Sequence, residues 1–152
     1  MTVTVDVQNR VGEGVPEEAE LHHWAAAALD EVQEPCELSI RIVDKQESTE
    51  LNARYRGREG PTNVLSFPFE SPVPMTPRLL GDVVICAPLV AQEAQRQGKS
   101  VKHHWAHLVV HGCLHLLGYD HIEDVQAKEM EALEVNILHT LDIENPYQER
   151  QA

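Results

Sequence analysis

The chain has 152 residues, a length that suits one globular domain with a single core. Its formal net charge of −13 argues against a simple nucleic-acid binder, although residues 36–110 hold 8 acids and 9 bases, so the middle of the chain is locally neutral. The three cysteines are widely spaced and form no CxxC pair, so neither a disulfide framework nor a cysteine-rich zinc site is indicated.

The ends of the chain and its hydropathy bear on where the protein acts. The N-terminal segment MTVTVDVQNR has no basic region followed by an apolar one, so we expect no signal peptide. No stretch of the sequence reaches the apolar length of a membrane helix. We therefore expect a cytoplasmic protein without a membrane partner.

The first half of the chain predicts two strands, each followed by a helix. Valines alternate with polar residues over residues 3–7, as on a half-buried strand, and a helix should run from Pro16 to about residue 33. A second strand is expected over residues 37–43. The next helix, at about residues 45–55, should begin at an Asp44 N-cap.

The second half predicts two more strands and three helices. The strands are expected over residues 62–69 and 79–86, and Pro68 places the first of them at a sheet edge. The helices are expected at about residues 88–98, 100–117 and 123–141. This mixed order predicts an α+β fold in which one domain, residues 1–152, packs a small mixed four-stranded sheet against about five helices.

Three histidines near the end of the fourth helix form the strongest candidate for a chemical site. His111 and His115 lie one turn apart, so their side chains share a helix face. Gly118 should end the helix and let the chain turn so that His121 reaches the same ion. Three protein ligands leave one position open for water, which is typical of a catalytic zinc site. We therefore predict one Zn²⁺ per chain, bound by His111, His115 and His121.

The spacing HxxxHxxGxxH resembles the helix and turn of the metzincin zinc proteases, whose motif is HExxHxxGxxH. In this chain Gly112 stands where those proteases have glutamate. That glutamate is their general base, so its replacement counts against a protease. His107, one turn before His111, is either a partner of a ligand or a plain surface residue.

Three segments together resemble the bacterial YbeY family. They are HGCLHLLGYDH, YRGREGPTNVLSFPFE (Tyr55 to Glu70) and LLGDVVIC (Leu79 to Cys86), and the resemblance covers nearly the whole chain. It implies a zinc-dependent, single-strand-specific endoribonuclease of ribosomal RNA maturation, above all at the 3′ end of the small-subunit RNA, and of ribosome quality control. It places the metal ligands of the family on the same three histidines and its functional arginine on Arg56.

The candidate catalytic residues are therefore Arg56 and His111. A guanidinium can hold two phosphate oxygens in a fork, and Arg54 and Arg58 are weaker candidates because closely spaced side chains diverge. We list Arg58, Asn63 and Ser66 as candidate substrate-binding residues. A turn-forming asparagine and an outward-facing serine remain the alternatives for the last two.

Asp120, next to a ligand, is a candidate for orienting an imidazole through its carboxylate. The expected partners are single-stranded ribosomal RNA and the small ribosomal subunit or its basic proteins, and the oligomeric state is left open. Two other functions stay open: a non-enzymatic ribosome-assembly factor with a zinc site, and a zinc hydrolase or peptidase of another class.

Overall fold

A four-stranded mixed sheet organises the fold in the computed structural model, which describes residues 3–119 and 124–147. Across the sheet the strands follow the order β1 (Val3–Asn9), β2 (Cys36–Val43), β4 (Arg78–Cys86), β3 (Val64–Pro68). The first three are parallel, and β3 runs antiparallel to β4 at the edge. The predicted mixed sheet and the edge position of Pro68 are both confirmed.

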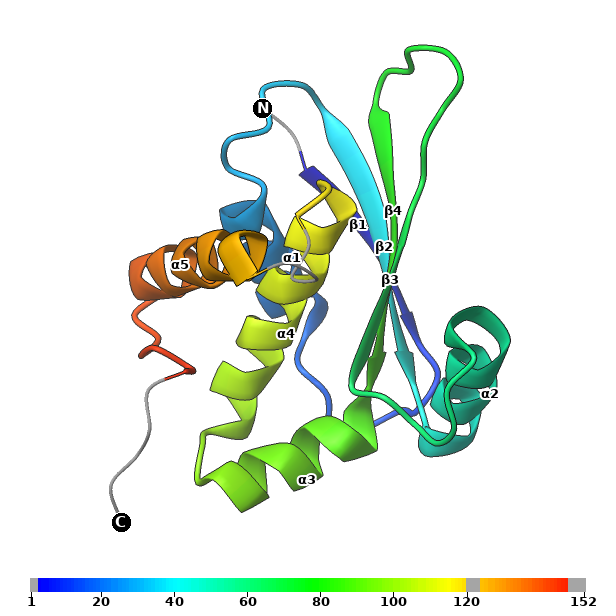
Figure 1. The fold of residues 1–152 in the computed structure, drawn as a ribbon, viewed down its shortest axis with the longest axis vertical. Coiled ribbons are helices and arrows are strands. Elements are labelled where there is room, and N and C mark those ends of the chain that lie inside the picture. Colours follow the sequence, from blue (N-terminus) through cyan, green and yellow to red (C-terminus); the bar gives the residue numbers. More distant parts are fainter. Residues whose placement is uncertain (1–2, 120–123, 148–152) are drawn as a thin grey trace.

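Helices cover both faces of this sheet within the described residues. They are α1 (Glu18–Ala28), α2 (Lys45–Arg56), α3 (Ala87–Gln97), α4 (Val101–Leu116) and α5 (Asp124–Thr140). Figure 1 views the sheet nearly edge-on, with α1, α4 and α5 on one side, α2 on the other and α3 across one end. The predicted α+β class is confirmed.

Helix α1 ends at Ala28, earlier than the predicted residue 33. Beyond it the chain tightens into a turn in which the backbone N–H of Val32 donates to the carbonyl of Leu29 at 2.9 Å. Both side chains remain in the core, with exposed fractions of 9% and 0%. The apolar pattern that predicted a longer helix therefore reflects burial and does not require helical backbone.

The larger core lies between the sheet and the group α1, α4 and α5. Leu38, Ile40 and Ile42 of β2 point into it, while the neighbouring Val43 joins a small separate cluster on the α2 side. This division follows from the alternation of side chains along a strand. It places α4 and its histidines on the main-core face of the sheet.

Helix α4 comes very close to the sheet at Gly112. A Cβ atom at this position would lie 2.6 Å from Val83 Cγ1 and 3.3 Å from Ser66 Oγ. The hydroxyl of Ser66 donates to the carbonyl of Gly112 at 3.1 Å, which joins β3 to the helix. The position where metzincins carry glutamate therefore faces the sheet, and a glutamate side chain there would collide with Val83.

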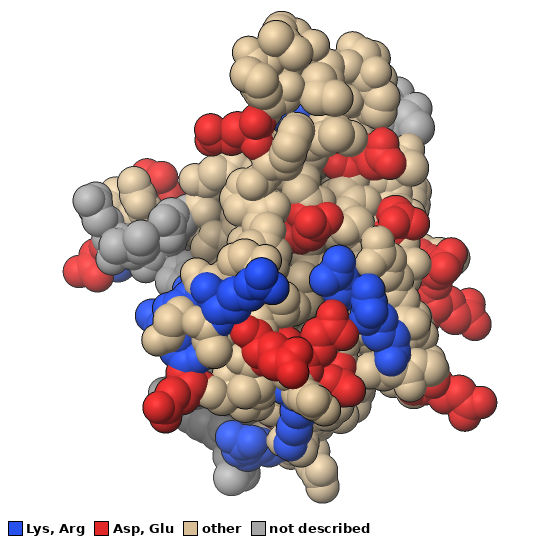
Figure 2. Space-filling model, turned by 90° about the vertical axis from the view of Figure 1, so that its right-hand side faces the viewer, with Lys and Arg blue, Asp and Glu red and all other residues tan. Residues whose placement is uncertain are grey.

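The outer surface differs from one end of the sheet to the other. On the face shown in Figure 2, basic and acidic side chains mix in the lower half, whereas the upper tip, formed by the β3–β4 hairpin, is largely uncharged. Phe69, Val73 and Met75 are exposed there. Among the residues that the structure describes, no helix has the length and apolar character that crossing a membrane requires.

We predict that Gly81→Ala destabilises the fold by about 3 kcal/mol or more, because it adds a steric clash to backbone strain. Gly81 has φ +130°, and a Cβ there would lie 2.1 Å from the backbone oxygen of Phe67. The control Gly14→Ala has φ +82° with nothing within 4 Å, so it should cost only about 1–2 kcal/mol. Urea unfolding followed by circular dichroism measures both. Equal losses would contradict the assigned strand contact.

Candidate metal centre and adjoining cleft

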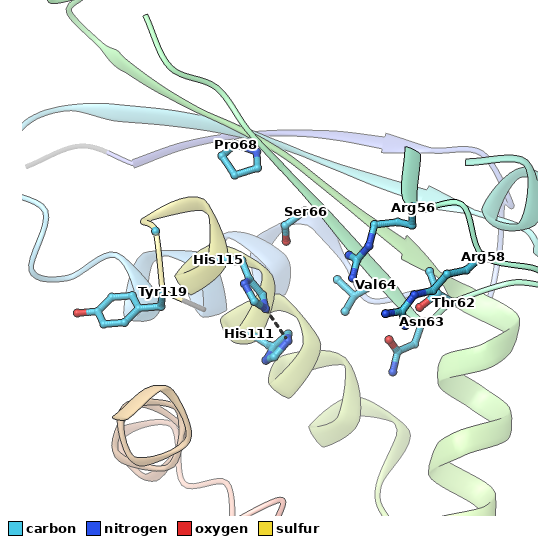
Figure 3. Close-up of a pocket in the computed structure, with 11 residues that line it drawn as sticks. Arg56, Arg58, Thr62, Asn63, Val64, Ser66, Pro68, His111, His115 and Tyr119 are labelled. Atoms are coloured by element: carbon cyan, nitrogen blue, oxygen red, sulfur yellow. Dashed lines mark hydrogen bonds between the residues drawn. The ribbon is translucent and has the colours of Figure 1, made fainter. Parts of the chain in front are cut away.

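A cleft of about 760 Å³ separates the end of α4 from the segment that joins α2 to β3. His111 and His115 contribute one wall (Figure 3). The facing wall carries Arg56 and Arg58, then Asn63 just before β3, and then residues of β3 itself. The cleft therefore sets potential metal ligands opposite cationic side chains.

Two buried polar residues of α2 hold the segment before β3 in place. The Ser48 hydroxyl donates to the carbonyl of Thr62 at 2.8 Å and accepts from its N–H at 3.0 Å. The Asn52 amide donates to the carbonyl of Gly60 at 2.9 Å. Since both side chains are almost fully buried, water competes little for these bonds. The segment enters β3 along a fixed path.

The end of α2 decides which arginines reach the cleft. Gly57 caps the helix in the left-handed region, with φ 64°, which turns the chain directly after Arg56. Arg56 and Arg58 both line the cleft and are exposed at its mouth. Arg54 lies with its guanidinium carbon 5.6 Å from the centre of the Tyr55 ring and does not line the cleft.

The two histidines of α4 aim the same ring atom at each other. Nε2 of His115 lies 3.1 Å from Nε2 of His111. Two nitrogen ligands of a tetrahedral zinc ion, each about 2.0–2.1 Å from the metal, lie about 3.3–3.4 Å apart. The observed separation is close to that value, so this pair fits two ligands of one ion.

A fully buried carboxylate fixes the orientation of His111. Glu134 of α5 accepts hydrogen bonds from Nδ1 of His111, from Nε2 of His107 at 3.1 Å and from the Tyr147 hydroxyl. Burial raises the pKa of Glu134, but these hydrogen bonds outweigh it and lower the pKa to about 2. With its Nδ1 proton held by an ionised carboxylate, His111 turns the lone pair of Nε2 toward His115.

His107 adds a second possible ligand set that overlaps the first. Its side chain, that of His111 and that of Glu134 offer ligand atoms within 4.8 Å of one another, an arrangement consistent with a zinc site. Burial lowers the pKa of His107, so its imidazole is neutral and Nε2–H is the donor to Glu134. The oxygens of Glu134 already accept three hydrogen bonds, which favours an orienting role for this carboxylate over direct ligation.

The structure brings most of the sequence-predicted residues to one cleft. Its lining includes Arg56, Arg58, Asn63, Ser66, His111 and His115. The hydroxyl of Ser66 is engaged with the carbonyl of Gly112, which gives this serine a packing role. Asp120 and His121 lie outside the described residues.

Sequence reasoning did not single out Glu134 or Tyr147, and it left His107 undecided. A signal for Glu134 was present, because it lies four residues from both Met130 and Leu138, which are buried on the core face of α5. An acidic residue within an apolar stripe needs a buried partner. Tyr147 follows α5 with no periodic pattern around it, so its contact with Glu134 emerges only in three dimensions.

Comparison with known proteins relates most of the chain to one family. A family model described as "Endoribonuclease YbeY" matches residues 6–142. The solution structure of TM1509 from Thermotoga maritima is similar, with a TM-score of 0.55, 21% sequence identity and coverage of 97% of this chain and 99% of that chain. At this identity the structural likeness shows a shared fold.

The two possible ligand sets, one built on His111 and His115 and the other on His107, His111 and Glu134, predict opposite effects of substitution on zinc affinity. If the ion lies between His111 and His115, His115→Ala should abolish stoichiometric Zn²⁺ binding, because the substitution removes a direct ligand. His107→Ala should weaken affinity by only about 10-fold, because it removes a partner of Glu134. Competition titration against a chromogenic chelator measures both, with His103→Ala on the same helix as the control. The reverse order would place the ion between His107, His111 and Glu134.

Proposed function

The chain belongs to the YbeY endoribonuclease family, and on that basis we propose that it is a zinc-dependent enzyme that cleaves single-stranded RNA. One observation carries the proposal: two imidazole nitrogens converge at 3.1 Å across a cleft from Arg56 and Arg58. The proposed substrate is ribosomal RNA, above all the 3′ end of the small-subunit RNA. The proposed setting is ribosome maturation and quality control in the cytoplasm, with the small subunit or its proteins as partners.

We propose that His111 and His115 hold one Zn²⁺ through their Nε2 atoms, with His121 as the third protein ligand. Three neutral imidazoles suit zinc better than magnesium or calcium, which prefer oxygen ligands. Such an ion supplies a Lewis acid for a phosphoryl oxygen and lowers the pKa of a coordinated water. Glu134 keeps the His111 ring in the tautomer that this role requires. For Asp120 we propose a similar orienting contact with a ligand histidine.

Arg56 is the residue proposed to bind the phosphodiester group that is cleaved. Cleavage builds negative charge on the non-bridging phosphate oxygens, and a guanidinium can donate to two of them at once. The exposed position at the mouth of the cleft lets Arg56 meet a strand as it enters. Arg58 lies in the same cleft and would bind a neighbouring phosphate of the strand.

The packing of α4 weighs against a peptidase. Gly112 faces Val83 at a distance that admits no side chain, so a glutamate base in the metzincin position could not face the cleft. The paired cations also suit a polyanionic substrate better than a neutral peptide. A purely structural zinc site is disfavoured because such sites usually close with four protein ligands inside the fold, whereas this pair faces a cleft.

We predict that the purified protein cleaves single-stranded ribosomal RNA and leaves a duplex of the same sequence intact. His115→Ala should lose both zinc and cleavage, because its ring is a proposed ligand. Elemental analysis of tag-free protein and gel assays of labelled RNA measure the two properties together. Wild-type protein that carries zinc but leaves RNA intact would support the assembly-factor alternative.

We predict that Arg56→Lys lowers kcat/KM for RNA cleavage by about 100-fold, the scale of losing one group that stabilises transition-state charge. Lysine keeps the charge but loses the two-pronged donation. The matched control is Arg54→Lys, since Arg54 lies against Tyr55 and outside the cleft lining. If Arg56→Lys kept full activity, its positive charge alone would be enough and the two-pronged role of Arg56 would fail.

A further inference from the structure

A chain of hydrogen bonds behind the cleft ends at Asn63. The Asn63 amide nitrogen donates to Glu93 Oε1 at 3.0 Å and to Oε2 at 3.3 Å. Nε2 of His104 lies 2.8 Å from the same Oε1 atom. Glu93 comes from α3 and His104 from α4, so two helices fix one side chain of the cleft wall. Figure 3 shows Asn63 at the Arg58 end of the cleft, opposite His111 and His115.

The surroundings of Glu93 and His104 decide which of their atoms donate and which accept hydrogen bonds. The hydrogen bond from His104 lowers the pKa of Glu93, burial raises it, and the hydrogen bond from Asn63 lowers it again. Glu93 is therefore an ionised carboxylate that can only accept. His104 is 5% exposed, and because the Glu93 carboxylate can only accept, Nε2–H of His104 is the donor to it.

This arrangement leaves Asn63 one orientation. Because Glu93 offers only acceptor atoms, the amide nitrogen must face it and the carbonyl oxygen is directed away. The backbone is fixed as well. The Cys86 N–H donates to the backbone carbonyl of Asn63 at 2.9 Å, and the Ser48 hydroxyl bonds both the backbone N–H and the backbone carbonyl of the preceding Thr62. The side-chain oxygen of Asn63 is thus a pre-oriented acceptor within the cleft.

We propose that this oxygen accepts a hydrogen bond from a ribose 2′-hydroxyl of the RNA strand, and that Glu93 and His104 are positioning residues that keep the amide from flipping. The inference rests on the proposed function, because it assumes an RNA strand in the cleft. It assigns to Asn63 the recognition of ribose. Arg56 and Arg58 cannot supply this recognition, because the phosphates that they would bind are common to RNA and DNA.

The chemistry of an RNA strand favours the 2′-hydroxyl over a base. Each ribose carries a 2′-hydroxyl donor next to its phosphate, whatever the base, whereas exocyclic amines vary with sequence. Asn63 and Arg58 line the same end of the cleft, so a phosphate bound by Arg58 brings a neighbouring ribose toward Asn63. One fixed acceptor is enough to separate RNA from DNA at that nucleotide.

The test is a scan of single 2′-deoxy substitutions through one cleavable oligoribonucleotide. In the wild type we expect one position, other than the cleaved linkage, at which the substitution lowers kcat/KM by about 3- to 10-fold, as for one neutral hydrogen bond. In Asn63→Ala the all-ribose substrate should lose the same factor, and the 2′-deoxy substitution at that position should then have no further effect. Circular dichroism and the melting temperature confirm that the variant folds.

The positioning residues have their own readout. Glu93→Ala should shrink the 2′-deoxy effect, because the amide of Asn63 is then free to flip. Glu93→Gln, which keeps the size of the side chain, should shrink it too, because a glutamine amide can donate to the Asn63 oxygen and so no longer enforces one orientation. Gln92→Ala, an exposed neighbour on α3, is the matched control and should leave the effect unchanged.

Three outcomes would overturn the inference. If Asn63→Ala kept the full 2′-deoxy effect, Asn63 would not contact that hydroxyl. An Asn63-dependent loss with inosine in place of guanosine, without a deoxyribose effect, would assign the acceptor to a base amine. Wild-type protein that cleaved no single-stranded RNA would overturn the proposed function together with this inference.

Discussion

The close contact between α4 and the sheet at Gly112 is the constraint on which the rest of the site depends. With hydrogen as its side chain, this residue lets the helix backbone settle beside Val83 and Ser66. The histidines before and after it, at positions 111 and 115, then turn toward the cleft beside the edge strand. The same contact explains why the metzincin-like spacing lacks its glutamate, because in this chain that helix face is a packing surface.

A fully buried carboxylate, Glu134, and a half-buried one, Glu93, then orient the polar groups of the cleft. Glu134 holds His111 on the helical wall, and Glu93 holds Asn63 on the facing wall. Each would be costly to bury as an isolated charge, and in each case hydrogen bonds from neighbouring side chains offset that cost. Both carboxylates lie behind the residues that line the cleft, whereas Arg56 and Arg58 are exposed at its mouth. A chain with a net charge of −13 can therefore present a locally cationic cleft to an anion.

Local patterns predicted much of this architecture, and contacts between distant segments account for what they missed. Alternating valines and the Asp44 N-cap, whose carboxylate accepts from the Glu47 N–H at 2.8 Å, have short-range causes. The four-residue spacing of His111 and His115 placed them on one helix face. Asn63 and Glu93, in contrast, are 30 residues apart and meet only because α3, which packs against α4 and β4, brings Glu93 to the segment before β3. Glu134 resembled the other acids of α5 until its position between two core residues was considered.

The site combines exposed charges with fixed polar groups. Arg56 and Arg58 are exposed near the end of a helix, so binding a phosphate must order long side chains at an entropic cost. His111 and Asn63 are already held by ionised carboxylates and lose little freedom on binding. Under the proposed function, the charges would attract a flexible anionic strand from many approaches, while the fixed polar groups would accept it in few orientations. Affinity and orientation would then come from different residues of one cleft, and each could change without loss of the other.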